Sequence, residues 1–242
     1  MHLVKLDAID STNDFLKMLV TKQMVKNHTV VSAETQTKGR GQMGSVWQSE
    51  SGKNLTMSLL VKNSIVNTGA LFQLNIAVAL AVIDVLQGHA IPLLSIKWPN
   101  DIMSGNHKIG GILIENSIKS DGIIDSIIGL GLNVNQFNFE NLPQASSLAV
   151  VAGKLFDKDA LLVEMGEMLI KSATLLSQNV APFYKRYNSY LFKRSVPMPF
   201  ENVAGFRFMG IIQDVAEDGR LQIILEDESI KRFDIKELKM LY

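Results

Sequence analysis

The chain has 242 residues, of which 47% are apolar, so it is long enough and apolar enough to bury a sizeable core. Its 24 basic and 24 acidic residues cancel, which excludes a global field toward nucleic acid or an anionic membrane and requires any anion site to be local. The lack of cysteine excludes disulfides and thiolate chemistry, and with no signal-peptide pattern and no apolar run of about 20 residues we expect a cytoplasmic protein.

The first part of the chain predicts two strands around a helix, followed by a long buried helix. Residues 2–8 alternate as in a strand, Ser11 begins a capped helix that ends near residue 20, and residues 29–33 form a second strand pattern. Residues 68–86 are apolar nearly all round and are followed by Gly88, which predicts a helix within the core.

Residues 93–134 consist of short β-rich runs separated by turn sequences, which predicts consecutive antiparallel hairpins. Helices are predicted over residues 157–177 and 182–192. Together these patterns indicate an α+β fold in which helices pack on a mixed, mainly antiparallel sheet.

The last 50 residues have a different texture. Short strand patterns cover residues 206–215, 221–225 and 231–235, which predicts a small β-barrel. Pro197 and Pro199 precede these strands and suggest a domain boundary, so we expect two domains, residues 1–192 and 193–242.

Residues 39–47, GRGQMGSVW, form a glycine-rich loop between two strand patterns. The glycines satisfy the GxGxxG pattern of dinucleotide-binding folds, but that motif must open a helix and needs an acidic residue about 20 positions later. Here a strand pattern follows at residues 55–61, and no Asp or Glu occurs between Glu50 and Asp84. The loop is better suited to closing over an anion with Arg40, and a mobile surface hairpin remains the alternative.

Two lysines lie in apolar strand patterns around the turn that carries Asn100 and Asp101. Lys97 and Lys108 are costly to bury there unless each is paired with an anion. The alternative is that each is an edge-strand side chain whose ammonium reaches water.

Other candidate residues each have a structural alternative. Gly110 and Gly111 interrupt a strand, which indicates close approach by a ligand or another backbone, or else a bulge. Asn13 could serve only to stabilise the first helix turn. Trp47 and Trp98 would by default be core residues.

The motifs STN, ETQ-x-x-GRG-x-x-G-x-x-W, KWPND, K-x-GGIL-x-E and GLGLNVN occur in this order, and together they resemble the catalytic core of biotin protein ligases. The match runs from Ser11 to about Asn135, and the segment from about Lys193 to Tyr242 is similar in size and position to the SH3-like domain of that family. The resemblance implies a class II synthetase-like catalytic domain. It also implies that the chain forms biotinyl-AMP and pyrophosphate from biotin and ATP, before a lysine of a biotin carboxyl carrier protein displaces AMP.

The resemblance also implies roles for individual residues. Lys108 and Arg40 would be catalytic, and Asp101 would meet Mg²⁺ brought by ATP, with no tightly bound prosthetic group. The nucleotide would be bound by Trp47, Lys97, Asn100, Asp101 and Asn133. Biotin would be bound by Ser11, Thr12, Asn13, Gln36, Gly39, Arg40, Gly41, Gln42, Lys108, Gly110 and Gly111.

The chain departs from repressor-type members of the family in two places. Gln42, Met43 and Ser45 stand where those members carry further arginines, so the loop is less cationic. The STN motif begins at residue 11, which leaves no room for their winged helix-turn-helix, and we expect no operator binding.

The family analogy allows a homodimer. The alternative functions are a lipoate or octanoate ligase or transferase of the same fold and a non-catalytic biotin sensor.

Overall fold

The computed structural model describes residues 1–65, 71–120, 122–140, 142–175 and 181–242. A seven-stranded sheet has the strand order β1-β2-β3-β7-β6-β5-β4. The first pair is parallel and the other neighbours are antiparallel, so the predicted α+β fold with a mixed sheet is confirmed. The strands are β1 (His2–Ile9), β2 (Thr29–Gln36), β3 (Leu55–Ile65), β4 (Leu94–Lys97), β5 (Asp101–Ser104), β6 (His107–Ile118) and β7 (Ile124–Leu132).

The parallel pair is joined by the helix α1 (Thr12–Lys22). The helix begins where predicted, because the Ser11 side chain accepts a hydrogen bond from the Asp14 backbone N–H at 3.4 Å. Leu16 of this helix is fully buried in a small core with Val31 and Leu60. α1 therefore covers part of one face of the sheet.

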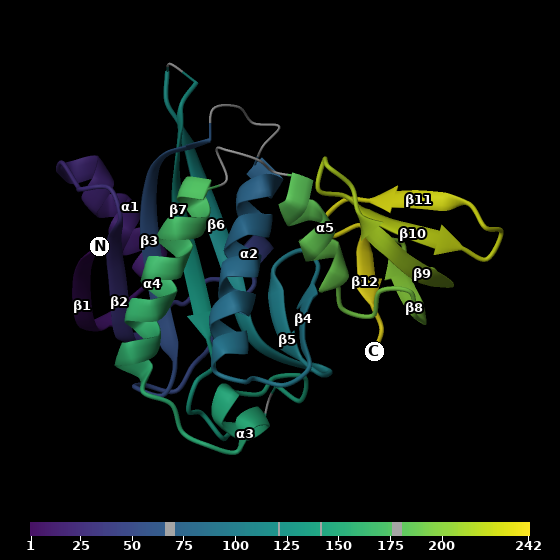
Figure 1. Cartoon of the computed structure of the whole chain (residues 1–242), viewed down its shortest axis with the longest axis horizontal. Coiled ribbons are helices and arrows are strands. Elements are labelled where there is room, and N and C mark those ends of the chain that lie inside the picture. Colours follow the sequence, from purple (N-terminus) through teal and green to yellow (C-terminus); the bar gives the residue numbers. More distant parts are fainter. Residues whose placement is uncertain (66–70, 121, 141, 176–180) are drawn as a thin grey trace.

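Two long helices cover the opposite face. α2 (Leu71–Gly88) and α4 (Lys158–Leu175) lie side by side against the sheet in Figure 1. Strand alternation separates the two cores, since Leu59 packs in the α2 and α4 core whereas its neighbour Leu60 packs in the α1 core. The first residues of the predicted helix 68–86 and the last of 157–177 lie outside the described residues.

α2 is confirmed as a core helix. Its 18 residues are long and apolar enough to cross a membrane by length and composition, but 61% of that stretch is buried inside the fold. Burial against α4, β4 and β6 accounts for its apolar composition.

The predicted hairpins over residues 93–134 are confirmed as the antiparallel series β4-β5-β6-β7. A short helix, α3 (Leu148–Ala152), was not predicted. The helix predicted over residues 182–192 is α5 (Ala181–Ser189). It ends early because residues 190–192 pair with β4, where the Ile96 N–H donates to the Tyr190 carbonyl and the Phe192 N–H to the Ile96 carbonyl.

A second sheet of five antiparallel strands has the order β11-β10-β9-β8-β12. Its strands are β8 (Pro197–Asn202), β9 (Arg207–Val215), β10 (Leu221–Leu225), β11 (Ile230–Phe233) and β12 (Leu238–Met240). The two-proline stretch forms the first strand of this sheet, which was not predicted. Its prolines are exposed and alternate with buried Met198 and Phe200, which gives the segment a strand pattern. The short strand β12 was not predicted.

Candidate functional site

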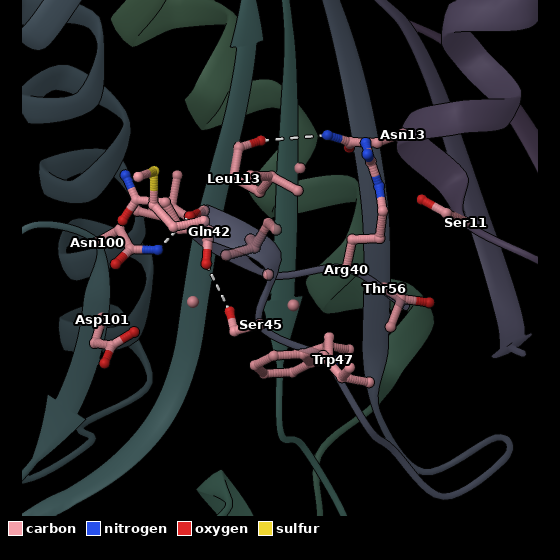
Figure 2. Close-up of a pocket in the computed structure, with 18 of the residues that line it drawn as sticks. Ser11, Asn13, Arg40, Gln42, Ser45, Trp47, Thr56, Asn100, Asp101 and Leu113 are labelled. Atoms are coloured by element: carbon pink, nitrogen blue, oxygen red, sulfur yellow. Dashed lines mark hydrogen bonds between the residues drawn. The ribbon is translucent and has the colours of Figure 1, made fainter. Parts of the chain in front are cut away.

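A cavity of about 450 Å³ lies on the face of the large sheet that α1 only partly covers. Strand alternation contributes to this cavity, because β3, β6 and β7 send large apolar side chains such as those of Leu59, Ile114 and Ile128 to the other face, into the core formed with α2 and α4. Three glycines of β6 and β7, namely Gly111, Gly129 and Gly131, form part of the cavity floor. Figure 2 shows the side chains that surround this floor.

Most of the predicted site residues line this cavity, although they come from four separate segments of the chain. They are Ser11, Thr12, Asn13, Gln36, Arg40, Gly41, Gln42, Trp47, Asn100, Asp101, Lys108 and Gly111. Four predicted residues are not part of its lining as the structure describes it, namely Gly39, Lys97, Gly110 and Asn133. Lining residues that sequence reasoning missed are Met43, Ser45, Val46, Thr56, Met57, Ile112, Leu113, Gly129, Leu130, Gly131, Ile235 and Lys236.

A hydrogen-bond network organises the wall beside α1. The Gln36 Oε1 accepts from the Thr12 backbone N–H at 2.8 Å and from the Thr12 hydroxyl at 3.1 Å, which leaves the Gln36 amide nitrogen available as a donor. The Ser58 hydroxyl donates to Asn13 Oδ1 at 2.6 Å and also lies 2.8 Å from Thr12 Oγ1. Ser58 is fully buried and was not predicted.

Asn13 is more than a residue of the first helix turn. Its Nδ2 donates to Glu115 Oε2 at 3.0 Å and lies 3.4 Å from the Leu113 carbonyl, while its Oδ1 accepts from Ser58. Both ends of the amide are therefore engaged within the protein. The packing is tight, since a Cβ added to Gly129 would overlap the Asn13 Oδ1. The Asn13 side chain connects α1 to strands β3 and β6.

Arg40 lies at the same side of the cavity. Its Nη2 is 2.6 Å from Glu115 Oε2 and 2.9 Å from Asp14 Oδ1. Figure 2 shows the side chain extending toward Asn13 and away from Asp101. The loop cation is thus paired with two carboxylates of the protein itself. Glu115 is the last residue of the K-x-GGIL-x-E motif. Strand alternation places it on the same face of β6 as Gly111, and this spacing is the sequence signal that could have identified it.

The charges of this cluster shift the titration of its members. Burial alone would raise the pKa of Glu115, but the hydrogen bonds from Asn13 and Arg40 outweigh it and hold the pKa below its ordinary value. The hydrogen bond to Glu115 raises the pKa of Arg40 above its ordinary value. Both groups are therefore charged at neutral pH.

A second charged cluster lies near the turn between β4 and β5. Lys108 Nζ is 2.6 Å from Asp101 Oδ1, and Lys97 Nζ is 3.8 Å from Asp101 Oδ2. Asp101 is thus the anion that offsets burial of both lysines. Lys97 lies over the Tyr242 ring, 4.9 Å from its centroid, whereas Lys108 lines the cavity.

A bulge explains how Lys108 reaches the cavity. Ile102 of β5 pairs with Gly110 and the next residue, Met103, pairs with Lys108, so Ile109 is the extra residue on β6. The bulge therefore accounts for Gly110, which packs against β7. Beyond the bulge, Gly111 faces the cavity, where an added Cβ would lie 3.4 Å from Lys108 Nζ.

Trp47 forms part of the cavity wall, so the default expectation of a core residue is wrong. A Cβ added to Gly131 would come within 2.5 Å of its Cε2, and Lys108 Nζ is 5.8 Å from the ring centroid. Its Nε1 is buried without a hydrogen-bond partner among the described residues. Trp98 is a core residue as expected, only 5% exposed, and its Nε1 donates to the Gly219 carbonyl at 2.9 Å.

The glycine loop is a tight hairpin. The Gly41 N–H donates to the Ser45 carbonyl at 2.8 Å and the Trp47 N–H to the Gly39 carbonyl at 2.9 Å, around a 3₁₀ turn at Gln42–Gly44. A Cβ at Gly39 or Gly41 would overlap Trp47 O or Ser45 Oγ, respectively. Gly39 therefore shapes the loop from outside the cavity lining. The loop leads to strand β3 rather than to a helix, which agrees with rejection of a dinucleotide turn.

The two remaining predicted asparagines bond to backbone. Asn100 Nδ2 donates to the Ile112 carbonyl at 2.7 Å and ties the β4–β5 turn to β6. Asn133 is buried, and its Nδ2 donates to the Ser146 carbonyl at 2.9 Å. Asn133 therefore holds the segment before α3.

The second sheet reaches the cavity through Ile235 and Lys236, in the turn between β11 and β12. These residues follow the first motif by more than 200 positions, and no pattern in the sequence marks them. In the described parts of the chain, no three His, Asp or Glu side chains gather as ligands for a metal ion. The cavity lining contributes the single carboxylate of Asp101.

Comparison with known proteins identifies relatives of this fold and cavity. Residues 6–133 match the Biotin/lipoate A/B protein ligase family. The chain is 30% identical to the biotin–[acetyl-CoA-carboxylase] ligase of Mycobacterium tuberculosis over 203 residues. This aligned region covers 79% of this chain and 71% of that protein. The biotin protein ligase from Aquifex aeolicus, solved in complex with biotin and ATP, is 26% identical with a TM-score of 0.81 over 99% of this chain and 98% of that chain.

Longer proteins are also similar. The bifunctional ligase/repressor BirA of Bacillus spizizenii is 33% identical over 194 residues, which is 78% of this chain and 55% of that protein. The chain spans about half the length of this relative.

Proposed function

Because the chain belongs to the Biotin/lipoate A/B protein ligase family, we propose that it is a biotin–protein ligase. It activates biotin as biotinyl-5′-AMP with ATP and transfers the biotinyl group to a lysine of a biotin carboxyl carrier protein. The relatives named as biotin ligases, and the Aquifex aeolicus ligase in complex with biotin and ATP, support these substrates. The observation that carries the proposal is one cavity with a polar amide and hydroxyl wall at α1 and the Lys108 cation across the floor.

The cavity suits the two anions that this reaction joins. A biotin carboxylate oxygen attacks the α-phosphorus of ATP and pyrophosphate leaves, and then the carrier amine attacks the acyl carbon and AMP leaves. Negative charge builds up where the carboxylate meets the phosphate, and Lys108 supplies a fixed cation there without acting as a nucleophile. Trp47 beside Lys108 offers the flat surface for the adenine base.

The α1 wall supplies the groups for the ureido ring of biotin. The hydroxyls of Ser11 and Thr12 and the amide nitrogen of Gln36 bind its polar atoms, while Gly41 and Gln42 cover the ligand. Asn13 and Gly39 act by shaping the wall and the loop. Lys97, Gly110 and Asn133 act from outside the lining, through Asp101, the β6 bulge and the segment before α3.

Magnesium fits this site only as an ion held mainly by phosphates and water. The cavity lining offers a single carboxylate, Asp101, which already pairs with two lysines. Such a donor set is typical of Mg²⁺ that arrives with a nucleotide. The ion would neutralise charge on the phosphates when bound.

We further propose that residues 1–192 form the catalytic domain and residues 193–242 an SH3-like domain, since the strands of the second sheet, from β8 to β12, all lie in the last 50 residues. The lack of cysteine supports a cytoplasmic location. The balanced charge supports an enzyme that does not bind DNA. A homodimer is compatible with the free edge of β1.

The test is pyrophosphate exchange with ATP, Mg²⁺ and either biotin or lipoate, followed by transfer of labelled biotin to a purified carrier domain. Exchange and transfer with biotin are expected. Exchange with lipoate alone would identify a lipoate ligase of the same fold. Tight biotin binding without any exchange would identify a sensor.

A further inference from the structure

One carboxylate joins the helix and the loop on this side of the cavity. Glu115 Oε2 accepts from Asn13 Nδ2 at 3.0 Å and from Arg40 Nη2 at 2.6 Å. The Glu115 side chain is 22% exposed, whereas that of Asp14, the second partner of Arg40, is 48% exposed. Because water and salt screen the more exposed pair more strongly, Glu115 is the stronger anchor.

Among the described residues, the ion-pair partners of Arg40 contact only its Nη2 atom. Both carboxylates bond to Nη2, and a guanidinium carries five N–H donors in a rigid fork. The donors on Nε and Nη1 can therefore face an anionic ligand while Nη2 stays on Glu115. Lys17 Nζ, 3.7 Å from Glu115 Oε1, adds a cation on the far side of the carboxylate.

We propose that Glu115 is a positioning residue of the adenylation site. Its carboxylate holds Arg40, and with it the glycine loop, in place before the ligand binds, and it fixes the Asn13 amide in the α1 wall. This inference rests on the proposed function for its link to biotin, but the positioning of Arg40 is a property of the ligand-free protein.

The test begins without ligand. Glu115→Gln removes the charge but keeps an oxygen that can accept from Asn13, and limited trypsin digestion reports how often Arg40 leaves its anchor. Cleavage after Arg40, measured by fragment mass, should be about three- to tenfold faster than in the parent, as for loss of one charge-assisted hydrogen bond. The matched control is Glu201→Gln, which removes a carboxylate paired with Arg207 in the second sheet. It should leave cleavage after Arg40 unchanged.

The second arm measures release of biotinyl-AMP. Glu115→Gln should raise the release rate about three- to tenfold and change the KM for ATP less than twofold. Combined with Arg40→Gly, it should add nothing to the effect of Arg40→Gly alone, because both changes remove one interaction.

Equal trypsin cleavage in Glu115→Gln and the parent, or additive release rates in the double variant, would overturn the proposal. If the parent forms no biotinyl-AMP, the proposed function fails, and the ligand-free cleavage still decides whether Glu115 anchors Arg40.

Discussion

At the scale of single residues, Lys108 is the cation whose setting points most directly to chemistry. It lines the cavity, pairs with Asp101 at 2.6 Å and lies beside the Trp47 ring. Lys108→Ala should slow formation of biotinyl-AMP by about 100- to 1,000-fold, the range for loss of one preorganised electrostatic donor. Single-turnover pyrophosphate release measures this step. Lys119→Ala, which removes a lysine paired with Asp125 away from the cavity, is the control, and near-normal turnover of Lys108→Ala would make Lys108 structural.

Arg40 should act on retention of the intermediate. Its guanidinium connects the glycine loop to Asp14 and Glu115, so Arg40→Gly removes the ion pairs that hold the loop over the cavity. A loop without this anchor opens more often, and biotinyl-AMP should dissociate faster. A chase of labelled biotinyl-AMP with unlabelled ligand measures the rate. The same dissociation rate in variant and parent would contradict this role.

At the scale of elements, the glycines of β6 and β7 make the cavity floor. Gly111 pairs with Gly131 across the two strands, and the Trp47 ring lies on Gly131. This close approach has no room for a methyl group, since the added Cβ would be 2.5 to 2.9 Å from three ring atoms. The absence of side chains here is therefore what allows a loop residue to reach the sheet.

Gly131→Ala should displace the Trp47 ring and raise the KM for ATP roughly tenfold, on the order of one lost aromatic contact. The tryptophan fluorescence emission of the variant should shift as the Trp47 ring moves away from residue 131. Gly88→Ala is the matched control, because a Cβ there meets no atom within 4 Å. Unchanged emission together with an unchanged KM would show that the ring is not needed where it lies.

At the scale of the whole molecule, the second sheet is fastened to the KWPND turn. The Trp98 Nε1 donates to the Gly219 carbonyl, and the Tyr184 hydroxyl of α5 donates to the Glu217 carbonyl at 2.7 Å. Burial, with the charges of Glu217 and Asp218, raises the pKa of Tyr184 to about 12, so this donor keeps its proton at neutral pH. Ile235 and Lys236 of the same sheet reach the cavity, which couples its placement to the site.

Trp98→Phe keeps a buried ring but leaves the Gly219 carbonyl without its donor. The expected loss in free energy of unfolding is about 1–3 kcal/mol, the cost of an unsatisfied buried acceptor. Urea denaturation measures this loss. Trp47→Phe is the comparison, because the Trp47 Nε1 has no partner among the described residues and its removal leaves no acceptor unpaired. Equal destabilisation by the two substitutions would argue against the hydrogen bond.

The sequence by itself determined the elements with strong local patterns. The apolar run of α2, the capped start of α1 at Ser11 and the hairpins of β4 to β7 were all predicted, because period and turn chemistry are properties of neighbouring residues. The short elements α3 and β12 carry too few residues for such a pattern. The site residues named from the motifs make up 12 of the 24 residues of the cavity lining, since each motif is a contiguous segment.

Only the tertiary structure decided which residues meet. Glu115 is 75 positions from Arg40, and Ser58 is 45 positions from Asn13, so no local pattern could pair them. The alternation of β6 and β7 placed Gly111 and Gly131 under Trp47, and the bulge at Ile109 turned Lys108 toward the cavity. The physical reason is that chemistry is carried by residue type, whereas the partner of each charge depends on strand register and on the packing of α1 over the sheet.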